Sequence, residues 1–182
     1  ICGARMARVT TELGGKSAAI ILDDARIEDV VGGIMPNLVG LAGQQCAAFS
    51  RILVPRNRRD EVVDAIASAM KAVQVGDPFD PATMMGPLVA RRQLDRVCGY
   101  IEGARRDGAK LVTGGGQPGH LNRGYFVEPT LFTDVHNDMT IAREEIFGPV
   151  GSVIVYDNEE EAINIANDSH YGLSGGVFTP DT

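Results

Sequence analysis

Short apolar runs alternate along this chain with segments whose apolar residues recur at helical spacing. Residues 17–22 and 52–54 are apolar runs of strand length, and the segment between them repeats apolar residues every three or four positions. Strands that alternate with helices are typical of a parallel sheet. The sequence therefore predicts an α/β fold, a layered and largely parallel sheet with flanking helices. Further strands are expected at 110–113, 125–127, 152–156 and 175–178.

Two helices are expected in the first half of the chain. The apolar residues of 27–38 share one helical face, and Asp23 or Asp24 is in position to cap this helix. Pro36 falls inside the pattern and is expected to kink or split the helix, because proline lacks the backbone N–H. Asp60 is expected to cap the second helix.

Two more helices are expected in the second half. The segment from about 90 to 107 carries an apolar stripe that includes Cys98, which indicates core packing for this thiol. Asp157 or Asn158 is expected to cap a last, short helix.

The charge of the chain argues against nucleic-acid partners. The formal net charge is −7, and the basic residues are scattered rather than gathered in a patch. No apolar run approaches the roughly 20 residues that cross a bilayer, so no membrane association is expected. The length of 182 residues is typical of one domain with a sizeable core.

The cysteines and histidines do not form a disulfide or metal pattern. Three widely spaced cysteines favour a reducing compartment, and we expect a cytoplasmic location. The histidines, His120, His136 and His170, lack metal-ligand spacing, and Cys-x-x-Cys is absent from the sequence. We therefore expect no metal site.

Cys46 lies between a turn of small residues and the strand expected at 52–54. The sequence Gly-Gln-Gln-Cys-Ala-Ala at 43–48 leaves room beside the thiol. A thiolate is a strong nucleophile that needs little beyond access and a lowered pKa. Cys46 is therefore a candidate nucleophile, although a lone cysteine is more often a small buried hydrophobe.

Two other stretches combine carboxylates with turn residues. Glu12 stands just before Gly14 and Gly15, and paired glycines let a backbone turn tightly or approach a ligand closely. The sequence Glu-Glu-Ile-Phe-Gly-Pro at 144–149 places an acidic pair and an aromatic ring ahead of a Gly-Pro turn.

Together, the three stretches resemble the aldehyde dehydrogenase superfamily. That family carries Glu-Leu-Gly-Gly-Lys, Gly-Gln-x-Cys and Glu-Glu-x-Phe-Gly-Pro in this order, and here they stand at 12–16, 43–46 and 144–149. Smaller family-like pieces at 86–88, 124–130 and 171–174 extend the resemblance over essentially the whole chain. The family's catalytic domain is an α/β fold, in agreement with the hydrophobic pattern.

The resemblance implies an oxidoreductase that converts an aldehyde to a carboxylic acid with NAD or NADP, through a cysteine thiohemiacetal and thioester. It also implies a division of the chain. Residues 1–13 are expected to be the tail end of the cofactor-binding domain, and residues 14–182 the catalytic (thiol) domain, truncated before a C-terminal arm. We therefore expect a homo-oligomer for the full-length enzyme and no activity from this portion alone.

The resemblance also implies catalytic roles. Cys46 would be the nucleophile, with its own backbone N–H as one oxyanion donor, and Glu12 would be the general base that activates water. Lys16 is expected to stabilise the turn rather than to take part in catalysis.

Cofactor contacts are implied for the other motif residues. Glu145 would accept hydrogen bonds from the ribose hydroxyls on the nicotinamide side, and Phe147 would support the nicotinamide ring. The resemblance implies that Leu13 and Gly14 contact the cofactor as well. Leu41, five positions before Cys46, is often an asparagine in the family, which puts the local support of the cysteine loop in doubt.

Three alternatives stay open. A coenzyme A-acylating semialdehyde dehydrogenase typically lacks the base at the Glu12 position, so Glu12 counts against it. A non-catalytic module that retains the fold would not need intact Cys46, Glu12 and Glu145. A cysteine hydrolase would need a histidine base, and the pattern places none beside Cys46.

Overall fold

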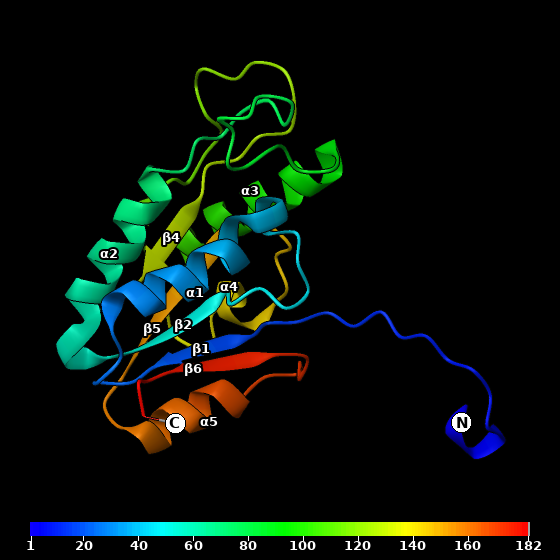
Figure 1. Ribbon diagram of the computed structural model, residues 1–182, viewed down its shortest axis with the longest axis vertical. Helices are drawn as coiled ribbons and strands as arrows, with labels where there is room; N and C mark the ends of the chain where they lie inside the picture. The colour runs from blue at the N-terminus through cyan, green and yellow to red at the C-terminus, as the bar shows by residue number, and fades with distance from the viewer. Residues whose placement is uncertain (182) are drawn as a thin grey trace.

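The computed structural model describes residues 1–181 and shows one mixed sheet between two layers of helices (Figure 1). The six strands run in the order β3-β4-β5-β2-β1-β6. All neighbours pair in parallel except β3 and β4, which pair antiparallel. This confirms the predicted layered, largely parallel sheet. The strands are β1 (Ala18–Ile21), β2 (Arg51–Pro55), β3 (Lys110–Thr113), β4 (Thr130–Thr133), β5 (Val150–Tyr156) and β6 (Gly175–Phe178).

Alternate side chains of the central strands enter two separate cores. Ile52 and Val54 of β2 pack beneath one helical layer, whereas Leu53 between them packs beneath the other. The first layer contains α1 (Ile27–Val39) and α2 (Arg59–Lys71), and the second contains α3 (Arg91–Arg106), α4 (Thr140–Arg143) and α5 (Glu159–Asn167). Three short 3₁₀ turns complete the elements, η1 (Gly3–Arg5), η2 (Gly40–Gly43) and η3 (Arg56–Arg58).

The helices form where the periodicity predicted them, but two of the predicted caps are wrong. The N-cap positions of α1 and α2 are Arg26 and Arg58, and neither side chain caps its helix. Asp23 instead accepts a hydrogen bond from the Asn57 side chain at 2.9 Å. The cap on α5 is confirmed, because Asn158 Oδ1 accepts from the Glu161 N–H at 3.0 Å.

Pro36 does not split α1, which continues to Val39. The proline lies in the last turn of the helix, where its carbonyl accepts the closing hydrogen bond from the Gly40 N–H. Asn37 adds a side-chain bond to the Gly33 carbonyl at 3.0 Å in the same turn. The donor missing at Pro36 is therefore close to an end of the helix that these two bonds hold together.

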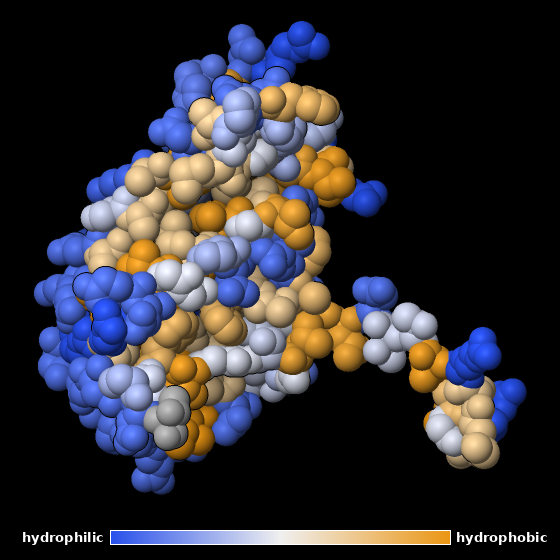
Figure 2. Space-filling view, in the orientation of Figure 1, coloured by the Kyte–Doolittle hydropathy of each residue, from blue (hydrophilic) through white to orange (hydrophobic). Residues whose placement is uncertain are grey.

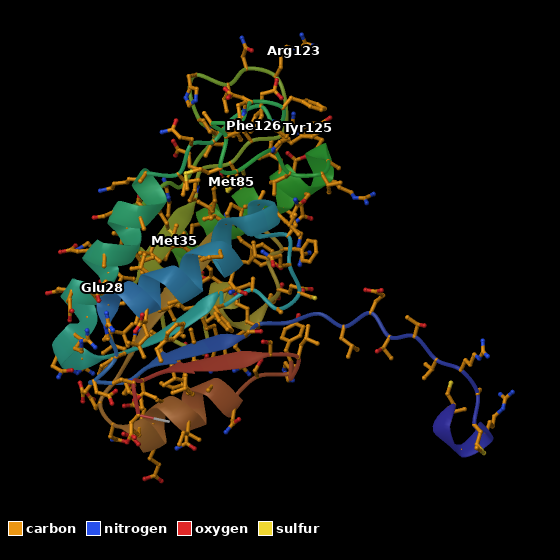
Figure 3. The ribbon with its side chains drawn as sticks, in the orientation of Figure 1. Glu28, Met35, Met85, Arg123, Tyr125 and Phe126 are labelled. Carbon is orange, nitrogen blue, oxygen red and sulfur yellow. The ribbon has the colours of Figure 1, made fainter. Side chains whose placement is uncertain are left out.

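The strand predicted at 125–127 is wrong, because pairing in this region begins only at Thr130. Pro129 precedes that strand and has no N–H to donate to a sheet ladder. Phe126 is nevertheless 6% exposed and Met85 2% exposed. Figure 3 labels both side chains in the loops beyond the end of α2.

Residues 1–13 extend away from the folded body as an exposed segment (Figure 1). The proposed domain boundary after residue 13 stays a prediction. Among the described residues, no helix is long and apolar enough to cross a membrane.

Candidate functional site

The three motif loops meet at one edge of the sheet. Gly14 and Gly15 lead into β1, Cys46 stands shortly before β2, and Glu145 shortly before β5. These three strands are adjacent in the order β5-β2-β1 and are mutually parallel, so their amino ends share one edge. Open α/β sheets more commonly bind ligands at the carboxyl ends of their strands. The strand order thus gathers the motif residues from distant parts of the sequence.

The thiol of Cys46 is on the surface and not in the core. The residue is exposed, in a turn between η2 and β2. Nearby Leu41 is 75% exposed and Val89 76%. Figure 2 shows apolar surface on this side of the molecule, between the end of α1 and the departing N-terminal segment. This location excludes the interpretation of Cys46 as a small buried hydrophobe.

Two glutamine side chains support the cysteine loop. Gln45 Nε2 donates to the Gly40 carbonyl at 2.9 Å, and Gln44 Nε2 donates to the Leu41 carbonyl at 2.9 Å. Gln44 Oε1 also accepts from the Val89 N–H at 3.0 Å. The cysteine loop is thus held by the two residues just before Cys46, with a leucine at position 41.

The glycine pair permits close contact with both other loops. A Cβ at Gly14 would lie 2.6 Å from Glu145 Oε2, and a Cβ at Gly15 would overlap the carbonyl oxygen of Cys46. The Gly15 N–H donates to Glu145 Oε1 at 3.1 Å. Glycine is therefore required here by the approach of neighbouring groups, and neither residue has a positive φ.

Glu145 and Phe147 project from the third loop. The Glu145 carboxylate is half-buried beside the glycine pair, and its backbone N–H donates to the Tyr171 hydroxyl at 3.4 Å. The Phe147 ring is 37% exposed, and its backbone has φ 60°, a left-handed conformation. Core packing of Phe147 is thus excluded. Tyr171 belongs to a family-like stretch, but the sequence did not indicate that its ring lies against Gly14.

Glu12 and Leu13 lie outside this cluster. Both are exposed in the extended N-terminal segment, and Leu13 is 57% exposed. Their expected roles therefore stay predictions.

Lys16 is buried behind the glycine turn. Its side chain is 1% exposed, and its Nζ has no hydrogen-bond partner within the described residues. Burial, followed by repulsion from Arg51, lowers the pKa of Lys16 to about 7, although Glu145 and Glu144 oppose this shift. The turn-stabilising role expected of Lys16 is wrong, because its ammonium binds nothing in the turn.

Arg51 is a second buried cation that the sequence analysis missed. Its side chain is 2% exposed and donates to the carbonyls of Lys16 at 3.0 Å, Ile165 at 2.8 Å and Ala166 at 2.8 Å. These bonds tie the start of β1 to the end of α5. The signal available in the sequence was a charged residue at the start of an otherwise apolar strand.

Within residues 1–181, no group of three or more His, Cys, Asp or Glu side chains is arranged to hold a metal ion. The site therefore offers a thiol, carboxylates and backbone donors as its reactive groups.

Comparison with known proteins matches this arrangement to one family. The family model described as "Aldehyde dehydrogenase family" matches residues 1–182. A curated betaine aldehyde dehydrogenase from Brucella anthropi is 49% identical over 181 residues, covering 98% of this chain. The betaine aldehyde dehydrogenase from Brucella ovis is 46% identical over the same length.

Solved structures superpose closely on the chain. A Mycobacterium tuberculosis aldehyde dehydrogenase in complex with NAD⁺ gives a TM-score of 0.93 at 50% identity over 99% of this chain. The NAD⁺ complex of an aldehyde dehydrogenase from Bacillus cereus gives 0.92 at 45% identity, also over 99% of the chain. The chain spans 37% of the length of the Brucella anthropi relative and 37% of the Mycobacterium structure.

Proposed function

Because this chain belongs to the aldehyde dehydrogenase family, we propose that it supplies the thiol-bearing part of an enzyme that oxidises an aldehyde to a carboxylic acid. The observation that carries this proposal is the meeting of Cys46, Gly15 and Glu145 at one edge of the sheet. The names of the curated relatives make betaine aldehyde the first substrate to test.

NAD or NADP is the proposed cofactor. Two matched structures are NAD⁺ complexes. The residues of this chain fit the nicotinamide end of such a molecule, because Glu145 is half-buried with its Oε2 free to accept, and the exposed Phe147 ring stands two residues away. Gly14 lies against the same carboxylate, and Leu13, which precedes it in the exposed segment, is the last of the proposed contacts. When bound, the nicotinamide accepts the hydride that the substrate releases.

Cys46 begins the proposed reaction. Its thiolate adds to the aldehyde carbon, and the carbonyl electron pair moves to oxygen to give a thiohemiacetal oxyanion. The Cys46 backbone N–H makes no hydrogen bond among the described residues, which leaves it available to this oxyanion. Loss of hydride from the former carbonyl carbon then leaves a thioester on Cys46.

Glu12 completes the cycle as the general base. Its carboxylate takes a proton from water, the resulting hydroxide attacks the thioester carbon, and the carbon–sulfur bond breaks to release the acid and the Cys46 thiolate. The exposed segment that carries Glu12 joins directly to Gly14 and Gly15, which contact the other two loops.

The test is to trap the acyl-enzyme. The full-length enzyme is mixed with betaine aldehyde and NAD⁺, quenched in acid, and digested for mass spectrometry. We expect the acyl mass on the peptide that contains Cys46, and none in Cys46→Ala. An acyl group on another residue, or full turnover by Cys46→Ala, would overturn the assignment.

The 182-residue chain alone is expected not to oxidise aldehydes. Holding the hydride acceptor in near-attack geometry is worth roughly 7–11 kcal/mol of barrier, and Glu145 with Phe147 can grip only the nicotinamide end. Slow hydrolysis of an activated ester through Cys46 is expected to survive. An NADH absorbance assay on the purified chain measures the oxidation, and release of the alcohol from an activated ester measures the hydrolysis, with Cys46→Ala as the control in each.

We further propose a homo-oligomeric full-length enzyme in the cytoplasm. The three free cysteines support a reducing compartment. Light scattering on the full-length enzyme and fractionation of its native cells test these two statements, and a monomer or a secreted protein would contradict them.

A further inference from the structure

One face of α3 contacts the whole length of the loop that carries Glu145 and Phe147. Gln93, Arg96, Val97 and Tyr100 follow one another at helical spacings of three, one and three residues, which places them on one side of the helix. Each of these side chains contacts a different part of residues 144–148.

Gln93 makes the central contact. Its Nε2 donates to the Ile146 carbonyl at 3.0 Å and to the Phe147 carbonyl at 2.6 Å. One amide nitrogen thus holds two consecutive peptide groups. Phe147 lies between them with φ 60°, a conformation that strains residues with a side chain and persists only where neighbouring groups enforce it.

The other three side chains hold the two ends of the loop. Arg96 Nη2 donates to the Glu145 carbonyl at 2.6 Å, and its guanidinium lies 5.1 Å from the centre of the Tyr100 ring. The Tyr100 hydroxyl donates to Glu144 Oε2 at 2.5 Å. Burial and this bond raise the pKa of Tyr100 to about 12, so the hydroxyl keeps its proton.

Val97 holds the far end of the loop. A Cβ at Gly148 would lie 2.5 Å from Val97 Cγ2, so the helix and the loop are in direct contact there as well. The loop is thus held on both sides of Phe147, and Gln93 is the side chain that reaches the strained peptide itself.

We propose that Gln93 is a positioning residue for the cofactor-contacting loop. Its amide holds Phe147 in the left-handed conformation and thereby sets the directions of the Phe147 ring and the Glu145 carboxylate. The inference rests on the proposed function, because it assumes that these two side chains contact the nicotinamide end of the cofactor.

The experiment is Gln93→Met in the full-length enzyme, because methionine has a similar length and helix propensity but no amide donor. Arg92→Met is the matched control, since Arg92 is exposed on the same helix. We expect the Kd for NAD⁺, measured by calorimetry, to rise roughly tenfold in Gln93→Met, because two hydrogen bonds are lost. Ester hydrolysis through Cys46 and the unfolding temperature should match those of Arg92→Met.

A direct probe of the loop is 4-fluorophenylalanine at position 147. Its ¹⁹F signal should shift and broaden in Gln93→Met and stay unchanged in Arg92→Met. Phe147→Gly gives the second background, because glycine adopts the left-handed conformation without restraint. Removing Gln93 should therefore raise the Kd for NAD⁺ less in Phe147→Gly than in the parent enzyme.

Three results would overturn the inference. An unchanged Kd and ¹⁹F signal in Gln93→Met, with a raised Kd in Glu145→Gln, would remove the role of Gln93 and keep the proposed function. An unchanged Kd in Glu145→Gln and in Phe147→Gly would remove the cofactor contacts themselves, and the inference would fail with them. If Gln93→Met lowered the unfolding temperature and slowed ester hydrolysis along with weakening NAD⁺ binding, Gln93 would have a merely structural role.

Discussion

Gly15 lies directly against the carbonyl oxygen of Cys46, and position 15 has no room for a Cβ. The same glycine donates its N–H to the Glu145 carboxylate at 3.1 Å. A single residue without a side chain therefore joins the three motif loops. The close approach of Gly15 therefore helps to position the backbone of Cys46.

Gly15→Ala should destabilise the chain and displace the cysteine loop. The added methyl group meets backbone atoms, which cannot rotate away as a flexible side chain can, and overpacking of this kind typically costs about 1–3 kcal/mol. Urea unfolding measures the loss, with Gly116→Ala as the control, because nothing lies within 4 Å of a Cβ there. Equal stability of the two variants would show that the glycine turn and the cysteine loop can move apart without cost to make room for the methyl group.

Leu41→Asn should stabilise the chain. Leu41 has φ 51° and is 75% exposed, so it bears the strain of the left-handed conformation and buries little apolar surface in return. Left-handed backbone costs about 1–2 kcal/mol for most residues and less for asparagine, so a gain on the order of 1 kcal/mol in the free energy of unfolding is expected. Val89→Asn, at a comparably exposed site without a positive φ, should give no gain.

Cys46 should react with iodoacetamide faster than Cys98. Cys46 is exposed, whereas Cys98 is half-buried, and burial raises the pKa of its thiol and so reduces the thiolate that reacts. Cys2 is also exposed, so the comparison is made in Cys2→Ser by peptide mapping after brief labelling. Faster labelling of Cys98 would contradict both placements.

Lys16→Met should stabilise the chain at low pH more than at high pH. The pKa of Lys16 falls from 10.5 to about 7 on folding, so the unfolded chain binds more protons between these values. The cost of burying the ammonium is complete below the folded pKa and disappears as pH rises through the unfolded pKa. The stability difference between Lys16→Met and the parent chain should therefore shrink from about pH 6 to about pH 10.

The control for this measurement is Lys71→Met, because Lys71 is exposed at the end of α2. The difference in stability between Lys71→Met and the parent chain should not shrink between about pH 6 and about pH 10. A pH-independent difference for Lys16→Met would show that folding does not lower the pKa of Lys16, as when a hydrogen-bond acceptor holds its ammonium in the folded chain.

Glu12→Gln in the full-length enzyme should slow release of the acid more than formation of the thioester. The amide cannot take a proton from water, while Cys46 and its N–H donor stay in place. Rapid mixing with NAD⁺ and betaine aldehyde should show a burst of NADH followed by a slow steady state. If Glu12→Gln lost both the burst and the turnover, Glu12 would also activate the thiol.

Hydrophobic periodicity predicted most of the elements because it depends on neighbouring residues alone. The alternation of Ile52, Leu53 and Val54 between two cores is the pattern of a buried strand, and the stripe from Ile27 to Leu38 is that of a helix. The capping predictions failed for two reasons. Asp23 binds the side chain of the distant Asn57, a partner that a local pattern does not show. Asp60 lies inside α2, because the helix already begins at Arg59.

The sequence alone determined that the chain builds an α/β sheet and carries three motif loops with a thiol, carboxylates and paired glycines. Only the tertiary structure decided that these loops share one edge, because the order β5-β2-β1 is a set of long-range pairings. Only the tertiary structure buried Lys16, whose sequence neighbours look like a surface turn, and placed Gln93 beneath the Phe147 loop. In each case, contacts between residues far apart in the sequence select one arrangement among several that the local pattern allows.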